Sequence, residues 1–405
     1  MDRFPIEKIF TLVIYLLILF YVTYYLSQWV GRIEKPISSI LMGIYSGLII
    51  YNLYLFFIPM LQKNLTPKPT IPSQSSSQVM NFPEGTSLPD IYYFVLDEAI
   101  GFKQGAEYFN DPEFMEFGKR LEELGFFVAY DSFSHSTNTL HEIAGRLNGL
   151  EYPQETDTQV LFDSIANNRV FSLTKEYGYT TVVFDQTATP LFYPLKTPIL
   201  ADVDLVDRNS EAIGYSFAFD GFSQLVFNET LLRPIVQWMA ISDPELGRLR
   251  ESSINILKRV NNLSDIPSPK ISYIHLMVAH PPFIFDRNGG PVDPRNMYDW
   301  NNYPASYKYL VDQMISISTQ ILNNAPPENL PIIIVQSDHG ARNTERSYDG
   351  LISPILVDYP EEYKKAIINA VYLPGQDYSM MNDQLDPQAV FPLIFERYFD
   401  TSLGQ

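Results

Sequence analysis

The chain contains no cysteine. Disulfide bonds, thiolate zinc sites and a cysteine nucleophile are therefore excluded, and any metal would need oxygen and nitrogen ligands. Histidine is also scarce, with five residues among 405. The composition is compatible with an exported protein, and the few histidines become the first residues to follow.

Positive charge is in short supply as well. The chain has 28 basic against 47 acidic residues, a formal net charge of -19. This balance argues against nucleic acid as a partner, because phosphate backbones require a basic face. It also argues against adsorption to an anionic membrane by charge alone. Hydrophobic residues make up 46% of the chain, enough to bury the core of one large or two ordinary domains.

Two long apolar runs stand near the start of the chain, Ile9 to Val30 and Ile37 to Ile58. Neither contains a charged residue, and 22 helical residues would span roughly 33 Å, enough to cross a bilayer. A signal peptide or a buried hairpin fits this length less well. We predict a two-helix membrane anchor over residues 1–61. Arg32 and Lys35 in the short loop favour a cytoplasmic loop, which places the rest of the chain outside.

The composition changes twice after the anchor. Residues 62–88 are rich in Pro, Ser, Thr and Gln, which predicts an extended linker. Residues 89–405 alternate strand-like and helix-like patterns, which predicts an α/β domain with a central, mostly parallel mixed sheet and helices on both faces. The expected strands are Ile91–Leu96, Phe126–Phe133, Tyr179–Phe184, Ile271–Val278, Ile332–Val335 and Ile367–Leu373. The expected helices are Asp111–Leu124, Leu140–Leu147, Arg169–Tyr177 and Tyr307–Asn323, with two or three more within 222–262.

Polar residues follow several of these strands directly. Asp97 and Glu98 follow the first strand, His280 follows a later one, and Asp338 and His339 follow the apolar run before Gly340. In open α/β sheets ligands bind beyond the carboxyl ends of the strands. Carboxylate oxygen and imidazole nitrogen are ordinary Zn²⁺ ligands, so these residues are candidates for a metal site. The alternative is a solvated turn in which Gly340 supplies a positive φ.

Thr139 is the candidate nucleophile, and two interpretations of it stay open. It opens a predicted helix with Glu142 three residues on, a spacing typical of a capping box. In that case Thr139 only caps the helix. Alternatively, its hydroxyl lies beside free backbone N–H groups at the helix N-terminus, where a phosphate or sulfate is well bound and a metal could activate the oxygen.

The order of these motifs resembles a known group of enzymes. An apolar strand ending in Leu-Asp97, a Thr-rich helix start, His280-Pro-Pro and Ile332-Ile-Ile-Val-Gln-Ser-Asp-His-Gly340 follow one another. This order resembles the membrane-anchored sulfatase-like branch of the alkaline phosphatase superfamily, which includes lipoteichoic acid synthases and lipid A phosphoethanolamine transferases. The resemblance covers roughly residues 89 to 400 and implies an alkaline phosphatase-like fold.

The resemblance also implies roles for individual residues. Asp97 corresponds to the metal ligand after the first strand, with Glu98 as the alternative. Thr139 corresponds to a threonine that ligates the metal and becomes covalently phosphorylated, with Thr137 as the alternative. Asp338 and His339 correspond to the remaining ligands of that metal. His280 corresponds to a histidine that contacts the transferred group or a second metal.

Two departures from the family pattern shape the expected chemistry. No histidine follows Gly340, so a full second metal site is not expected, and Arg342 or Asn343 would take over its role. The Cys/Ser-X-Pro-X-Arg signature that sulfatases convert to formylglycine is absent. We therefore expect a membrane-anchored enzyme, dependent on Zn, Mn or Mg, that hydrolyses or transfers phosphate esters, such as lipid or envelope phosphodiesters, outside the cytoplasm. A sulfuric ester hydrolase and a catalytically degenerate envelope scaffold are the alternatives.

Overall fold

The computed structural model describes residues 88–184, 199–204, 244–260, 263, 266–293, 296–297, 299–342, 359–401 and 403. The predicted anchor, nearly all of the predicted linker and residues 222–243 of the range 222–262, where two or three helices are expected, lie outside these residues. Among the helices of the described part, none combines the length and the apolar character that a membrane span needs.

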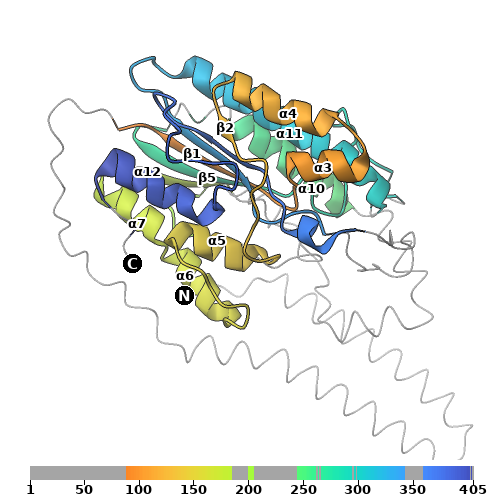
Figure 1. Ribbon diagram of the computed structural model, residues 1–405, viewed down its shortest axis with the longest axis horizontal. Helices are drawn as coiled ribbons and strands as arrows, with labels where there is room; N and C mark the ends of the chain where they lie inside the picture. The colour runs from red at the N-terminus through yellow and green to blue at the C-terminus, as the bar shows by residue number, and fades with distance from the viewer. Residues whose placement is uncertain are drawn as a thin grey trace, which may run out of the picture. The chain divides into compact units, whose positions relative to one another are not determined.

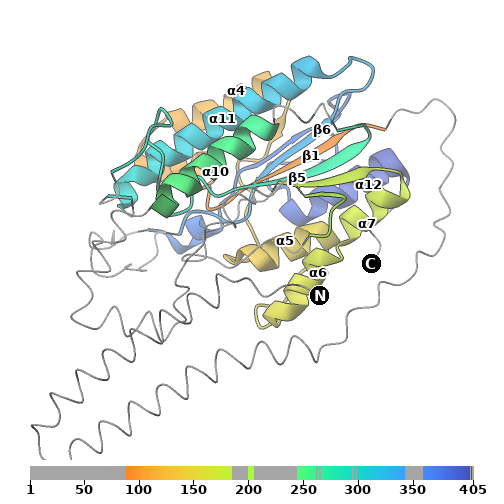
Figure 2. The same cartoon turned by 180° about the vertical axis from the view of Figure 1, so that it is seen from behind.

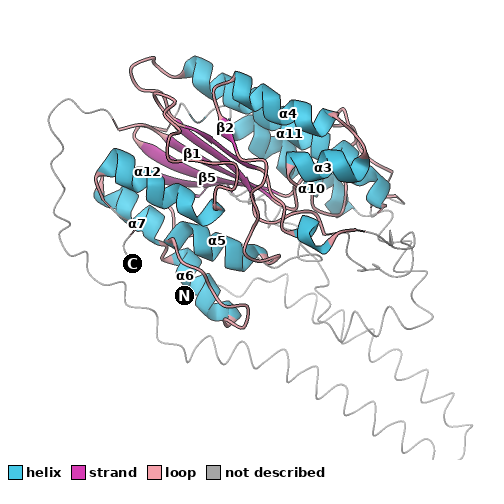
Figure 3. Ribbon diagram, viewed as in Figure 1, coloured by secondary structure: helices cyan, strands magenta, loops and turns pink. Residues whose placement is uncertain are grey.

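In the described part of the chain, seven strands form one sheet in the order β2-β7-β6-β1-β5-β3-β4. Figure 3 shows the sheet between two groups of helices. Strand β1 lies in the middle and pairs in parallel with both β5 and β6. The pairs of β7 with β6 and with β2 are antiparallel. The predicted mostly parallel mixed sheet is thus confirmed. The strands are β1 (Ile91–Leu96), β2 (Phe127–Val128), β3 (Thr180–Phe184), β4 (Val203–Asp204), β5 (Lys270–Leu276), β6 (Ile332–Ser337) and β7 (Asn369–Tyr372).

Helices cover both faces of this sheet, as predicted (Figures 1 and 2). One face carries α3 (Phe102–Phe109), α4 (Glu113–Glu123), α10 (Pro244–Val260) and α11 (Tyr303–Asn324). The other face carries α5 (Thr139–Asn148), α6 (Thr158–Ala166), α7 (Arg169–Glu176) and α12 (Val390–Phe399). Three short 3-10 helices complete the described elements: η3 (Trp300–Asn302), η4 (Glu361–Lys364) and η5 (Pro387–Ala389).

The side chains of β1 alternate between the two layers because successive residues of a strand point to opposite faces. Tyr92, Phe94 and Leu96 belong to the apolar core that also contains the α4 and α11 residues. Tyr93 and Val95 belong to the core under α5 and α12. A strand buried on both faces needs apolar residues throughout, which explains the uninterrupted run in the sequence.

The register of the three central strands aligns their carboxyl ends. Leu96 lies opposite both Leu276 of β5 and Ser337 of β6. The N–H group of Asp97 continues this ladder and donates to the carbonyl of Leu276 at 2.9 Å. The polar residues that follow these strands therefore leave the sheet at one edge.

The expected strand Phe126–Phe133 is shorter than predicted. Only Phe127 and Val128 form a strand, and Phe133 makes an isolated antiparallel bridge to Ala366. Between them, the N–H group of Tyr130 donates to the Asp383 carboxylate at 2.7 Å, so this part of the chain leaves the ladder. Helices α3, α6 and α12 were not predicted from the sequence.

Candidate active site

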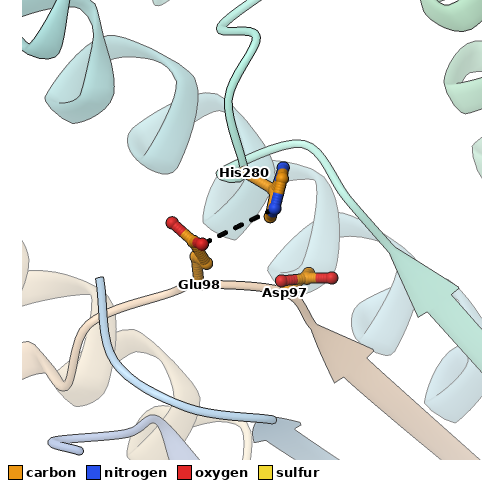
Figure 4. A group of neighbouring side chains, drawn as sticks. All are labelled: Asp97, Glu98 and His280. Carbon is orange, nitrogen blue, oxygen red and sulfur yellow. Dashed lines mark ion pairs between the residues drawn. The ribbon is translucent and has the colours of Figure 1, made fainter. Parts of the chain in front are cut away.

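The candidate metal ligands meet at the carboxyl edge of β1, β5 and β6. Asp338 and His339 follow β6 and are fully buried, and Asp97 follows β1 and is 3% exposed. Ligand atoms of these three residues all lie within 4.8 Å of one another. A second group of the same kind contains Asp97, Glu98 and His280, and Figure 4 shows how these side chains converge from two strand ends. Asp97 belongs to both groups.

Thr139 begins α5 but does not cap it. The cap is Asn138, whose side-chain oxygen accepts from the N–H groups of Leu140 and His141. The interpretation of Thr139 as a helix cap is therefore wrong. Its hydroxyl instead donates to Asp338 Oδ2 at 2.7 Å and lies 3.5 Å from His339 Nε2.

Backbone groups hold Asp338 and His339 in place. Asp338 Oδ1 accepts from the N–H groups of Glu98, at 3.0 Å, and His339, at 2.8 Å. His339 Nδ1 lies 2.8 Å from the carbonyl oxygen of Gly340, which can only accept, so Nδ1 carries the proton. In the neutral ring, Nε2 then keeps its lone pair, and this atom lies 3.2 Å from Asp338 Oδ2. A proton on one ring nitrogen bound to a carbonyl, with the other nitrogen facing a carboxylate, is the arrangement of a metal-ligating histidine.

Asp97 presents an oxygen with an unmet need for a partner. Its Oδ1 atom is buried and has no hydrogen-bond partner among the described residues, whereas Oδ2 lies 3.3 Å from His275 Nε2. Burial raises the pKa of this carboxyl, but the imidazoles of His280, His275 and His339 outweigh burial and hold the pKa below its ordinary value. The group is thus ionised at neutral pH. A buried anionic oxygen is costly unless it is paired or bound to a metal, so the residues present fit a divalent cation.

Glu98 adopts a backbone conformation that side chains rarely take, with φ of 57°. Its N–H group donates to Asp338, and its carbonyl accepts from the hydroxyl of Tyr303 at 2.8 Å. The same hydroxyl accepts from the N–H group of Ile100 at 2.9 Å. These contacts hold the left-handed turn, whose strain is of the kind found at functional sites. Since Glu98 is absent from the group that contains Asp338 and His339, the geometry favours Asp97 as their companion ligand.

Arg342 reaches the same side of the site. Its Nε and Nη2 atoms lie 2.7 and 2.5 Å from Glu98 Oε1, and Nη1 donates to the carbonyl of Thr137 at 3.3 Å. Burial lowers the pKa of Arg342, but the carboxylates of Glu98 and Asp97 raise it by more than burial lowers it. The pKa therefore lies above its ordinary value and the guanidinium is charged. Thr137, the alternative nucleophile, contributes a backbone carbonyl here. Asn343 lies outside the described residues.

A fully buried ion pair between Arg146 and Glu142 holds the end of β6 beside the site. It was not predicted from the sequence. Arg146 in α5 donates to the carbonyls of Ser337 and Asp338, both at 2.6 Å, and to Glu142 at 2.9 Å. Glu142 in turn accepts from the N–H group of Ser136 at 2.5 Å. These contacts tie the helix that carries Thr139 to the end of β6. The signal in the sequence was the spacing of Glu142 and Arg146. They lie four residues apart in the expected helix, whose other residues suit the core, and this spacing lets the two side chains pair.

His275 was also missed as a site residue. It is buried and lies opposite Val95 in the parallel register, on the face of the sheet that α5 covers. A single imidazole within the strand Lys-Ile-Ser-Tyr-Ile-His-Leu was the available signal, because a polar residue on a strand buried on both faces needs a partner.

Gly340 does not have the positive φ that the turn interpretation assigned to it. Its N–H group donates to the carbonyl of Lys364 at 2.9 Å, and a Cβ atom at this position would lie 2.6 Å from the carbonyl oxygen of Ala366. Glycine is needed because the backbone of 363–366 approaches closely. The small residue therefore positions a neighbouring segment and does not form a turn.

No family model and no curated protein matches the sequence. Among solved structures, the chain is similar to the C-terminal periplasmic domain of EcEptC from Escherichia coli in complex with Zn, with 12% identity over 78% of this chain and 83% of that one and a TM-score of 0.48. It is also similar to the lipooligosaccharide phosphoethanolamine transferase A from Neisseria meningitidis (10% identity, 98% and 70% covered, TM-score 0.48). A third is the lipoteichoic acid synthase LtaP from Listeria monocytogenes (13%, 76% and 71%, TM-score 0.43).

Two of these solved structures are described as a phosphoethanolamine transferase and a lipoteichoic acid synthase, the two kinds of enzyme that the order of the sequence motifs resembles. With identities this low and TM-scores under 0.5, we take no residue role from them. The roles that follow depend on the contacts within this chain.

Proposed function

We propose that this protein is a membrane-anchored, metal-dependent enzyme that hydrolyses or transfers phosphate esters with Thr139 as its nucleophile. The observation that supports this most is the position of the Thr139 hydroxyl, 2.7 Å from Asp338 Oδ2 at the edge of a buried group of ligand atoms. A hydroxyl that caps no helix and contacts a carboxylate and an imidazole is placed for chemistry.

Asp97, Asp338, His339 and the Thr139 oxygen would hold one divalent ion, Zn, Mn or Mg. Carboxylate oxygen and imidazole nitrogen are ordinary Zn²⁺ ligands, and the buried Asp97 Oδ1 atom fits such a ligand. When bound, the ion supplies positive charge that lowers the pKa of the hydroxyl and stabilises the charge of the transition state.

The residues of the chain divide the remaining tasks. The hydrogen bond to Asp338 orients the Thr139 oxygen and gives its proton an acceptor. Attack forms a bond from this oxygen to phosphorus while the bond to the leaving oxygen breaks, which leaves a phosphothreonine ester. Water or an acceptor alcohol then attacks the same phosphorus and releases Thr139. We assign His280, which lies with Asp97 and Glu98 in the second group, to contact with the transferred group.

The substrate class follows from where we propose the domain lies. Two spans within 1–61 and a linker over 62–88 would hold the catalytic domain, 89–405, at the outer face of the membrane. An anchored site suits a substrate confined to the bilayer, such as a lipid or envelope phosphodiester. The net charge of -19 makes nucleic acid a poor substrate. A degenerate scaffold would gain nothing from a buried carboxylate oxygen without a partner.

Turnover of Thr139→Ala tests the proposal. Phosphatidylglycerol and a chromogenic phosphodiester serve as substrates, and an aryl sulfate tests the sulfuric ester alternative. We expect the phosphodiester rate to fall by about 10³-fold or more. Thr137→Ala is the matched control and retains its rate. An unchanged rate in Thr139→Ala, or a preference for the aryl sulfate, contradicts the proposal.

A further inference from the structure

The turn that follows β1 takes its strong hydrogen bonds from other segments of the chain. Figure 4 shows Asp97 and Glu98 on this turn. Inside the turn, the N–H group of Ala99 reaches the carbonyl of Leu96 only at 3.4 Å, which is long for a hydrogen bond. Glu98 has a positive φ of 57°, so a weakly bonded turn at this position needs outside partners to keep one conformation.

Tyr303 provides two of these hydrogen bonds through one oxygen atom. Its hydroxyl donates to the carbonyl of Glu98 at 2.8 Å and accepts from the N–H group of Ile100 at 2.9 Å. The oxygen therefore bridges the two peptide units that flank Ala99 and closes the turn. Tyr303 begins α11, on the face of the sheet that also carries α3 and α4 (Figure 1), and its side chain is fully buried.

Aromatic neighbours fix the ring that carries this hydroxyl. Trp300 stacks on Tyr303 with ring centroids 4.5 Å apart and an interplanar angle of 19°. Phe109 stacks on it at 5.7 Å, and Phe283 meets it edge-on at 5.8 Å. A ring packed on several sides cannot follow the turn if the turn relaxes. The hydroxyl is therefore held at a set position, and the turn must adapt to it.

The position of Glu98 in turn affects how the carboxylate of Asp338 is oriented. The N–H group of Glu98 donates to Asp338 Oδ1 at 3.0 Å, and the N–H group of His339 donates to the same oxygen. With Oδ1 held in this way, Oδ2 contacts the hydroxyl of Thr139 at 2.7 Å and His339 Nε2 at 3.2 Å. A continuous series of hydrogen bonds thus leads from Tyr303 through Glu98 and Asp338 to Thr139.

We propose that Tyr303 is a positioning residue for the candidate metal site. Its hydroxyl holds Glu98 in the left-handed conformation, which directs the Glu98 N–H group at Asp338 and fixes the turn that presents Asp97. The inference rests on the proposed function and deepens it, because it adds a residue from α11 that prepares the ligands before a metal binds. Residues that orient metal ligands in this way typically change metal affinity by about 10- to 100-fold.

One turn further along α11, the chain offers a matched control. Tyr307 is also fully buried, and its hydroxyl donates to the carbonyl of Ile100 at 2.9 Å. Removing either hydroxyl takes a hydrogen bond from a buried backbone group of the same segment, so both variants should melt at a lower temperature than the wild type. The two hydroxyls differ in that Tyr303 bonds to Glu98 and Tyr307 bonds to Ile100 alone.

The zinc affinity of the full chain in detergent tests the proposal. Titration calorimetry measures zinc binding to the wild type, Tyr303→Phe and Tyr307→Phe, and thermal unfolding confirms that each protein is folded. We expect Tyr303→Phe to bind zinc roughly 10- to 100-fold more weakly than the wild type. Tyr307→Phe should keep the affinity of the wild type. A purely structural role of Tyr303 would lower the melting temperature and leave the zinc affinity of the folded protein unchanged.

Hydrogen exchange of the metal-free wild type tests the same idea without a variant, and it serves if Tyr303→Phe does not fold. The N–H groups of Glu98 and Ile100 donate to Asp338 and Tyr303, so both should exchange slowly before any metal is added. Mass spectrometry of overlapping peptides across residues 96–101 measures the rates. Exchange at the rate of an unprotected peptide would show that the hydroxyl does not hold the turn, and would overturn the proposal.

The outcomes separate the inference from the proposed function. Equal zinc affinity in the wild type and a folded Tyr303→Phe overturns the inference and leaves the proposed function standing. An equal loss of affinity in Tyr303→Phe and Tyr307→Phe also overturns it, because the contact with Glu98 would then have no special role. A wild type that binds no zinc overturns the proposed function and with it the inference.

Discussion

Two aspartates lie just beyond opposite ends of strand β1, and their surroundings differ. Asp90, at the amino end, accepts from Lys270 Nζ at 2.5 Å, from the Lys270 N–H group at 3.0 Å and from Ser268 at 2.9 Å. Asp97, at the carboxyl end, keeps a buried oxygen without a partner among the described residues. Buried polar groups are normally satisfied, so an exception is informative. The contacts at the amino end serve stability, and we propose that the carboxyl end binds a ligand.

The largest expected effect separates these two aspartates by function. Asp97→Asn should lose about 10⁴-fold in phosphodiester turnover, since in the proposed function it removes a charged metal ligand. It should also lose the rise in melting temperature that zinc gives the wild type. Asp90→Asn should keep both properties. Turnover rates and thermal unfolding with and without zinc measure this, and a zinc-dependent shift that persists in Asp97→Asn contradicts the comparison.

The next effect concerns the ion pair beneath the open end. Arg146→Met should lower the free energy of unfolding by about 3–5 kcal/mol, because Glu142 is left buried without its partner. Chemical denaturation measures the change. The double variant Arg146→Met/Glu142→Gln should recover part of the loss, since glutamine carries no charge. A single variant within about 1 kcal/mol of the wild type would show that this pair does not hold α5 to β6.

A smaller effect is expected at the amino end. Asp90→Asn should lower the free energy of unfolding by about 1–3 kcal/mol, because Lys270, 3% exposed at its side chain, loses a charged acceptor. Asp90→Asn/Lys270→Met should be less destabilised than the single variant. Equal stability of Asp90→Asn and the wild type, measured by denaturation, would remove the contrast between the two ends of β1.

The smallest effect is expected on the surface of the domain. Glu116 and Lys119 form an ion pair of 2.6 Å in α4, and both side chains are more than half exposed. Solvent screens such a pair, so Lys119→Ala should produce no measurable change in stability or turnover. A clear loss of stability in the same denaturation assay would mean that the distance between two charges, and not their burial, determines how much such a pair stabilises the fold.

Much of the site could be predicted because it depends on where strands end. Asp97, Asp338 and His339 each follow an apolar run directly, and parallel pairing brings such ends together. The orientation of Thr139 toward Asp338 and His339 was one of two open interpretations. Both Asn138 and Thr139 are good helix caps, and only the backbone shows which of them accepts the N–H groups.

Other features could not be predicted because they depend on contacts between distant segments. Glycine is needed at Gly340 because the backbone of 363–366 approaches it closely. The Glu142–Arg146 pair is buried against the end of β6, where Arg146 donates to the carbonyl of Asp338. His275 faces Asp97 through the register of β1 and β5, which a single sequence does not show. Strand β2 is likewise short because Asp383, more than 250 residues further along the chain, accepts a hydrogen bond from the N–H group of Tyr130.

The account depends most on the hydroxyl of Thr139, and trapping its covalent intermediate tests it most directly. The full chain is mixed with a phosphodiester substrate, quenched in acid during turnover, digested and examined by peptide mass spectrometry. The account predicts the phosphorus of the substrate on Thr139, still esterified to the alcohol that does not leave, and none on Thr137. A chain that turns over substrate while this adduct is found on another residue would contradict it.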